Sequence, residues 1–226
     1  YVDNSGLLVT WADGDKIAIY ADANDANPDE FTLKSKSADG RTGTFTGTLT
    51  KAGVSCPVVY PYTKDTKSGD VLKKVLAKNQ EGTLADLGKY DVMTGTYNTT
   101  TSWMSYLEHQ IAVFKLTTPA TSGQTGVSIR GAWGDKLYYA SSTATTSYIA
   151  VEAVNVKAGT NLYASTYVSG STNVYTKNIA ETNTMSGQKI NITFSGKAVS
   201  YTATGVHANH EYVTIDGKNW ATCNVG

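Results

Sequence analysis

The side chains most able to do chemistry in this chain are its three histidines and a run of acidic residues near the N-terminus. His207 and His210 have the H-x-x-H spacing of a pair of metal ligands, but no glutamate lies between them to act as a general base. Exposed linker histidines are therefore the favoured interpretation there. His109 lies in a strand-like pattern, which predicts a hydrogen-bonded structural residue. We expect no catalytic site and no enzyme activity.

The acidic stretch 22–30 offers oxygen ligands at every second or third position, which is the chemistry that calcium prefers. It lacks the glycine and the terminal glutamate of an EF-hand loop, so a solvated polar loop is favoured over a calcium site. Asp13 and Asp15 flank Gly14 and are typical of a tight turn rather than of a catalytic pair. The sequence predicts no bound metal or other cofactor.

Cys56 and Cys223 are the two cysteines, and most of the chain separates them. They could form one long-range disulfide. Two separate structural thiols are the favoured interpretation, because a free cysteine commonly packs as a small buried hydrophobic residue. A scaffold of several disulfides is excluded by the count.

Four aromatic residues beside turns could stack on sugar rings: Trp103, Trp133, Tyr138 and Tyr139. Aromatic side chains of this kind more often fill a core or cover its edge, and that alternative is the favoured one. A carbohydrate-binding module of a larger surface protein is accordingly our second functional hypothesis.

The composition sets the class of fold in which these residues must be placed. The chain has 226 residues, is 40% hydrophobic and only 17% charged, and carries 19 basic against 19 acidic residues. This balance argues against electrostatic capture of nucleic acid or of an anionic membrane. No run of 18 apolar residues is present that could span a bilayer. Tyrosine, threonine and glycine are abundant, which favours pleated sheets joined by turns.

Short alternating segments between polar turns predict an all-β fold. The stretch from Trp11 to Tyr20 predicts a hairpin corner at Gly14, pinned by a buried tryptophan, and then a strand with Ile17 and Ile19 on one side. Further strands are expected at 41–50, 55–60, 89–97, 111–117, 127–131, 137–140, 148–156, 162–168, 173–177 and 190–194. In the segment 111–117, one alternating face is expected to be core and the other largely covered.

One segment departs from this pattern. Val71, Leu72, Val75 and Leu76 follow helical spacing within 70–80, and Asp70 precedes them as a candidate N-cap. The linker-like stretch 117–123 places a domain boundary near residue 120. We therefore expect one β-sandwich at 1–120, a second at 121–209 and the start of something new at 210–226.

Several motifs share their order with a known family. The residues concerned are Trp11, Gly14, Asp15 and Ile17, then Phe45 and Gly47, then Tyr60, Pro61 and Tyr62, then Gln80, and then His109. With the segments 89–93 and 157–167 they resemble the fimbrillin-like surface proteins of Bacteroidales, over about residues 8 to 204. The tail 213–226 resembles the opening of a further C-terminal domain of surface proteins in the same bacteria.

This resemblance implies two tandem transthyretin-like β-sandwich domains with Greek-key-type connections. It implies a pilus subunit or pilus-associated lipoprotein at the cell surface, in the outer membrane or in a fimbrium, held to the membrane only by a lipid anchor outside this chain. Its partners would be other subunits, which add a strand to its sheet, and a host protein or glycan. Family pilins are cleaved after an arginine, yet neither Arg41 nor Arg130 lies at an obvious cleavage site. The family would also make the segment 71–76 extended, and we adopt that expectation.

Overall fold

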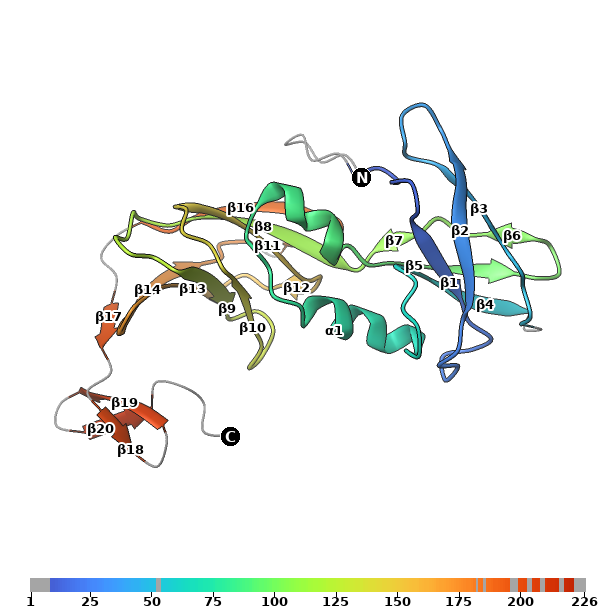
Figure 1. Cartoon of the computed structure of the whole chain (residues 1–226). Coiled ribbons are helices and arrows are strands. Elements are labelled where there is room, and N and C mark those ends of the chain that lie inside the picture. The colour runs from blue at the N-terminus through green and yellow to red at the C-terminus, as the bar shows by residue number, and fades with distance from the viewer. Residues whose placement is uncertain are drawn as a thin grey trace.

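The computed structural model describes residues 9–51, 54–181 and 186–195, together with the backbone at 183–184, 199–202, 205–207, 210–215 and 218–221. Strands are the main regular structure in this part of the chain, with one short α-helix and two 3-10 helices (Figure 1). The expected all-β class is confirmed.

The first half of the chain forms a seven-stranded antiparallel sheet. Its strands are β1 (Lys16–Ile19), β2 (Asp29–Lys36), β3 (Gly43–Gly47), β4 (Ser55–Tyr60), β5 (Met93–Asn98), β6 (Trp103–Met104) and β7 (Glu108–His109). The order is β3-β2-β1-β4-β5-β6, and β7 pairs with β5. Because β4 returns beside β1 after the β1-β2-β3 meander, these four strands have the Greek-key order.

The helical segments lie between β4 and β5: a 3-10 turn (Ser68–Asp70), α1 (Val71–Leu76) and a second 3-10 helix (Leu84–Tyr90). The expectation of an extended segment at 71–76 was wrong. Val71 and Val75 are one helical turn apart, and both are buried against Tyr20 and Val59 of the first sheet. Asp70 occupies the N-cap position, but its side chain makes no capping hydrogen bond.

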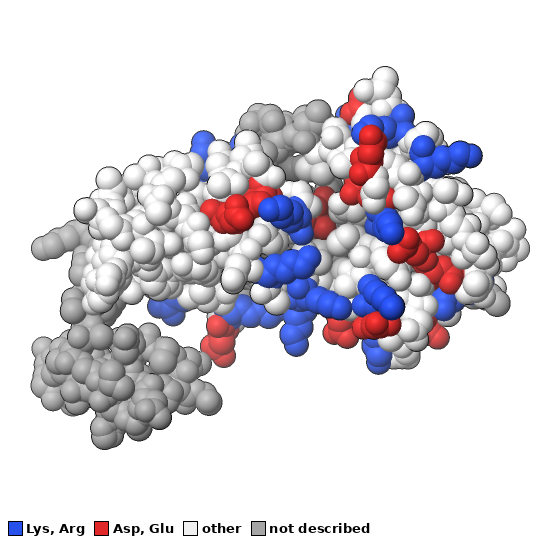
Figure 2. Space-filling model, in the orientation of Figure 1, with Lys and Arg blue, Asp and Glu red and all other residues white. Residues whose placement is uncertain are grey.

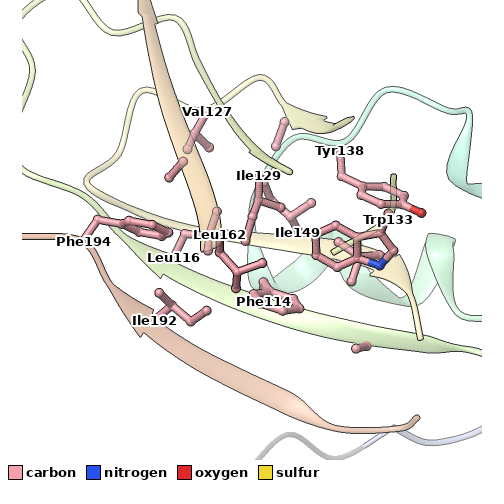
Figure 3. Packing of buried hydrophobic residues seen from close by; sticks show 14 of the residues in the cluster. Phe114, Leu116, Val127, Ile129, Trp133, Tyr138, Ile149, Leu162, Ile192 and Phe194 are labelled. Carbon is pink, nitrogen blue, oxygen red and sulfur yellow. The ribbon is translucent and has the colours of Figure 1, made fainter. Parts of the chain in front are cut away.

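The second half contains two facing sheets. The strands are β8 (Ile111–Thr117), β9 (Gly126–Arg130), β10 (Leu137–Ala140), β11 (Thr146–Glu152), β12 (Asn155–Val156), β13 (Asn161–Val168), β14 (Ser171–Asn178), β15 (Asn183–Thr184), β16 (Lys189–Thr193) and β17 (Val199–Thr202). One sheet has the order β10-β9-β13-β14-β17, the other has β11-β8-β16, and β12 pairs with β15. Apolar side chains from both sheets form one cluster between them (Figure 3).

Strand β8 belongs to two cores at once. Ala112, Phe114 and Leu116 face the sandwich cluster. Ile111 and Val113 belong to a second apolar cluster, which lies between the first sheet and α1. This confirms the expectation that one face is core and the other is covered. Among the described strands, β8 pairs with β11 and β16, so the change of sheet falls between His109 and Ile111. The domain boundary expected near residue 120 stays a prediction.

The stretch from Trp11 to Tyr20 folds largely as expected. Ile17 and Ile19 lie in one apolar cluster, and Ala18 and Tyr20 lie in the cluster on the other face of the sheet. Gly14 has a φ of 90°, which its missing Cβ permits. The turn is a corner rather than a hairpin, because the Trp11 backbone N–H donates to Gly40 O instead of to β1.

The last described strands form a small antiparallel sheet of β18 (Gly205–His207), β19 (His210–Ile215) and β20 (Lys218–Ala221). Its register pairs His207 with His210. The side chains of both histidines lie outside the described residues, as does Cys223. Cys56 is buried in the apolar cluster on the β1–β4 face.

Candidate functional site

One side of the sandwich is closed by the side chain of Gln80. This glutamine is 2% exposed, and its side-chain amide pairs with the edge of β11 as a backbone peptide group of a neighbouring strand would. Its Nε2 donates to Ala150 O and its Oε1 accepts from Ala150 N, both at 2.8 Å. Since an unpaired strand edge recruits other chains, this pairing removes one place where a further strand could add.

Neighbouring groups complete the same closure. Gly82 O accepts from Tyr148 N at 2.8 Å, and the Trp133 indole Nε1 donates to Glu152 O at 2.8 Å. Gln80 O also accepts from Ser141 N, directly after β10, at 2.8 Å. The segment 80–82 therefore bridges β10 and β11, the edge strands of the two facing sheets. We call the side of the sandwich formed by these groups the closed edge.

The opposite edge of the three-stranded sheet is β16, and it has no second strand partner in the described part of the chain. Strand β16 runs parallel to β8, with Val113 N donating to Gln188 O and Phe194 N donating to Thr117 O. Alternate residues of a parallel strand turn their backbone groups to opposite sides. The N–H and C=O groups of Asn191 and Thr193 therefore point away from β8. We call this side the open edge.

A pocket of about 430 Å³ lies at the end of the first sheet where β1 begins and β4 ends. It is lined by Val9, Thr10, Trp11, Ala12, Asp15, Arg41, Tyr60, Ala85, Gly88, Lys89, Asp91, Met93 and His109. Four residues of the family signature, Trp11, Asp15, Tyr60 and His109, thus meet at one place although they come from distant parts of the chain. The sequence predicted each of them but did not predict that they share a pocket.

Hydrogen bonds hold the polar groups of this pocket in place. The Tyr60 hydroxyl donates to Asp15 Oδ1 at 3.1 Å, and the Ala12 backbone N–H donates to Asp15 Oδ2 at 2.8 Å. His109 Nδ1 lies 2.8 Å from Asp91 Oδ1, which agrees with the expected structural, hydrogen-bonded histidine. Burial, and then the nearby Asp15 carboxylate, raise the pKa of Tyr60 well above its usual value. The tyrosine therefore stays a neutral hydrogen-bond donor.

The remaining signature residues pack the first sheet. The Trp11 ring contacts Phe45 and Tyr60 edge-to-face, with centroids 4.9 and 5.2 Å apart, although Trp11 is half-buried rather than fully buried as expected. At Gly47 an added Cβ would lie 2.4 Å from Glu30 O, so only glycine fits this approach of two strands. Pro61 ends β4, and Tyr62 packs against the cluster beneath the sheet.

Carboxylates in the loop 22–30 already accept hydrogen bonds from backbone N–H groups around them. Asp22 accepts from the N–H groups of Asn24 and Asp25, and Asp25 accepts from those of Ala21 and Asn27. Asp29 accepts hydrogen bonds from the N–H and the hydroxyl of Thr50 and from the N–H of Lys51. Within the described residues, no group of three or more potential metal ligands comes together.

Two of the four aromatic residues considered for glycan stacking, Trp133 and Tyr138, are in the core, which is the favoured alternative for them. Trp133 is 7% exposed and packs between Phe114 and Tyr138, with ring centroids 5.6 and 5.1 Å away (Figure 3). Their position follows from the folding of the β9–β10 segment over the sheet, which sequence spacing alone does not specify. Trp103 is 59% exposed, and Tyr139 is also exposed.

Comparison of the chain with protein-family models, with curated proteins and with solved structures gives no match. In the part that the structure describes, none of the helices has the length and apolar character needed to cross a bilayer.

Proposed function

We propose that this protein is a fimbrillin-like structural or adhesive protein of the bacterial cell surface that assembles by β-strand addition, without catalysis. Under this proposal its two β-rich halves are tandem transthyretin-like sandwiches. The observation that carries the proposal is the asymmetry of the second half, where side chains occupy the β11 edge and β16 offers backbone groups to a further strand.

Two further features of the open edge support this proposal. Asn191 and Thr193 are exposed and uncharged, and neither is a proline, so neither residue discourages pairing with a further strand. Ile190, Ile192 and Phe194 alternate with them and pack on the sandwich core. An added strand would thus extend a sheet whose inner face is already anchored, and main-chain hydrogen bonds would supply most of its affinity.

Charged side chains are unevenly distributed over the surface. Figure 2 shows lysine, arginine and acidic side chains gathered over the first sheet and α1, whereas the visible face of the sandwich carries few of them. The partner would be an extended segment of another subunit.

Assembly of the mature full-length protein tests this proposal. It would be incubated with an arginine-specific protease and examined for filaments by electron microscopy. Asn191→Pro removes the outward N–H at the centre of β16 and leaves the bonds to β8 intact, so it should abolish filaments. Asn191→Ala keeps that N–H and should assemble like the parent protein.

Two outcomes would contradict the proposal at different levels. If neither a polymer nor a strand-bound complex forms under any condition, the pilus-subunit function is wrong. Filaments that form equally well from Asn191→Pro would leave assembly standing and show that β16 is not the edge used.

A further inference from the structure

Tyrosine side chains gather on the outer face of the five-stranded sheet. Core residues of β9, β10 and β13 alternate with residues that point away from the sandwich, because successive side chains of a strand lie on opposite faces. The outward residues include Arg130, Leu137, Tyr139, Tyr163 and Tyr167, and we call this set the tyrosine face. Tyrosine and arginine are enriched in binding surfaces and acidic residues are depleted there. Strands β9, β10, β13 and β14 contain no acidic residue, so the tyrosine face has the composition of a binding surface.

Contacts within the sheet hold two of the rings in place. The Tyr139 ring lies across Gly126, where an added Cβ would clash with it. The rings of Tyr139 and Tyr167 meet edge-to-face, with their centroids 5.6 Å apart. The Tyr167 hydroxyl lies 2.9 Å from Ser128 Oγ, within hydrogen-bonding distance. Because these rings are already fixed, they would lose little conformational entropy when a ligand binds.

Arg130 is the charged residue of the tyrosine face. Lys177, the other charged residue of β9, β10, β13 and β14, is in register with Leu162 on the core side. The Arg130 Cζ lies 5.0 Å from the centroid of the Tyr163 ring, which is a cation–π contact. None of the ion pairs within the described residues involves Arg130. Since its guanidinium is exposed, it can pair bidentately with a carboxylate of a ligand.

The backbone of this face is closed to a peptide strand. Strand β9 lies between β10 and β13, and β13 lies between β9 and β14, so both are hydrogen-bonded on their two sides. Strand addition, which binds extended peptides through main-chain groups, therefore cannot use them. The single cation also argues against nucleic acid, in which every nucleotide brings a phosphate. Aromatic rings with hydroxyl groups remain, and these suit the apolar C–H faces and hydroxyl rim of a sugar.

We propose that the tyrosine face binds an oligosaccharide that carries one carboxylate-bearing sugar among neutral ones. Arg130, oriented by Tyr163, pairs with the carboxylate, and the rings of Tyr139 and Tyr167 contact the neighbouring neutral sugar. Arg130 is in register with Leu137, two residues before Tyr139, so the Cα atoms of Arg130 and Tyr139 are about 8 Å apart. One ligand of two or three sugars can reach both. Strand β16 belongs to the other sheet, so this proposal does not rest on assembly at the open edge.

Isothermal titration calorimetry of the full chain tests this proposal. The probes are two acidic oligosaccharides, 3′-sialyllactose and cellobiouronic acid, and their neutral counterparts, lactose and cellobiose. We expect at least one acidic sugar to bind about tenfold or more tightly than its neutral counterpart, which lacks the charge-assisted hydrogen bonds. The peptide acetyl-Ala-Glu-Ala-amide has one carboxylate and no sugar ring, and it should bind more weakly than that acidic sugar.

Variants of the tyrosine face locate the site. Arg130→Gln should weaken binding of the acidic sugar by about tenfold or more, because the carboxylate loses its charged donor. Tyr139→Leu keeps an apolar side chain without the ring and should weaken it by a smaller factor. Arg41→Gln, which changes the only other arginine of the sequence, is the matched control and should bind like the parent protein. Added salt should also weaken binding to the parent protein, a check that needs no variant.

The other outcomes are also decisive. Binding of neither acidic sugar, or equal binding by the parent protein and Arg130→Gln, would overturn the proposal. Equal affinity for each acidic sugar and its neutral counterpart would overturn the requirement for a carboxylate. Tighter binding of the peptide than of both acidic sugars would overturn the saccharide in favour of an acidic protein segment. Asn191→Pro should bind the acidic sugar like the parent protein, so a failure here is distinct from a failure of assembly.

Discussion

The two edges of the three-stranded sheet differ in how their backbone groups are used. At the closed edge, Gln80, Gly82 and Trp133 bind four outward backbone groups of β11. At the open edge, Asn191 and Thr193 of β16 direct theirs away from β8, and no described strand pairs with them. Both strands pair with β8 and send apolar side chains into one core, so burial does not distinguish them.

This difference teaches that a strand edge can be closed without a further strand. A glutamine amide has the donor and acceptor spacing of a peptide group, and here it pairs with both backbone groups of Ala150. A tryptophan N–H and one loop carbonyl complete the closure. Such groups protect one edge against unwanted pairing and leave the other available. The predictions that follow alter the closed edge and compare it with a matched exposed site, beginning with the largest effect.

Trp133→Ala should be the most destabilising change. It removes a core ring packed against Phe114 and Tyr138 and leaves Glu152 O without its donor, so the free energy of unfolding should fall by about 3–5 kcal/mol. Trp103→Ala is the control, and since that ring is exposed it should cost less than about 1 kcal/mol. Urea denaturation followed by circular dichroism measures both. Equal losses would show that Trp133 is not part of the closed edge.

Proline substitutions compare the two edges directly. Ala150→Pro removes an N–H that Gln80 Oε1 binds in a fully buried site, and we expect a loss of about 3 kcal/mol or more. Asn191→Pro removes an outward N–H at an exposed position and should cost less than about 1 kcal/mol. Thermal unfolding of the two variants gives the comparison. A large loss at 191 would mean that its N–H is already bonded within the molecule.

Gln80→Leu should cost about 2–3 kcal/mol, because it leaves the N–H and C=O of Ala150 buried without partners. Gln110→Ala removes an exposed hydrogen bond to Glu108 O and should change stability by about 0.5 kcal/mol or less. Chemical denaturation separates the two. Because Gln80→Leu also opens β11, we expect it to self-associate more than the parent in size-exclusion chromatography. A Gln80→Leu protein of parental stability would contradict the role of the amide.

The ion pair beside the closed edge should contribute least. Lys136 Nζ lies 2.5 Å from Glu152 Oε2, and this carboxylate raises the pKa of Lys136 above its usual value. A raised folded-state pKa gives a contribution that is complete below the unfolded value and is lost as the pH rises through the folded value. Both side chains are solvent-accessible, so Lys136→Met should cost only about 0.5 kcal/mol at neutral pH.

The pH dependence of this small loss is the check. The stability difference between Lys136→Met and the parent protein should shrink in strongly alkaline solution, where Lys136 is neutral in both the folded and the unfolded chain. A difference that grows with pH would reverse the sign and contradict the pairing with Glu152. Lys157→Met, which changes an exposed lysine outside this edge, should show no such trend.

Alternation and turn chemistry predicted much of the sheet structure from the sequence. The two faces of β8, the sides taken by Ile17 and Ile19, and the core face of β16 all follow from side chains that alternate along a strand. The helix at Val71–Leu76 was also visible in the local spacing. Following the family resemblance in place of that spacing produced the error there.

The functional features were harder to predict because they depend on distant contacts. Gln80 and Ala150 are far apart in the sequence, and only the fold brings the amide to the strand edge. The sequence favoured a core position for the aromatic residues beside turns. Which of them are buried, here Trp133 and Tyr138, depends in the same way on how the β9–β10 segment lies over the sheet.

Hydrogen exchange at β16 tests the central claim most directly. In the isolated protein, the amides of Ile192 and Phe194 face β8 and should be protected, whereas those of Asn191 and Thr193 should exchange quickly. After assembly of the mature full-length protein, all four should be protected, because an added strand binds the outward pair. Slow exchange at Asn191 and Thr193 in the isolated protein, or fast exchange there in the assembled state, would contradict the account.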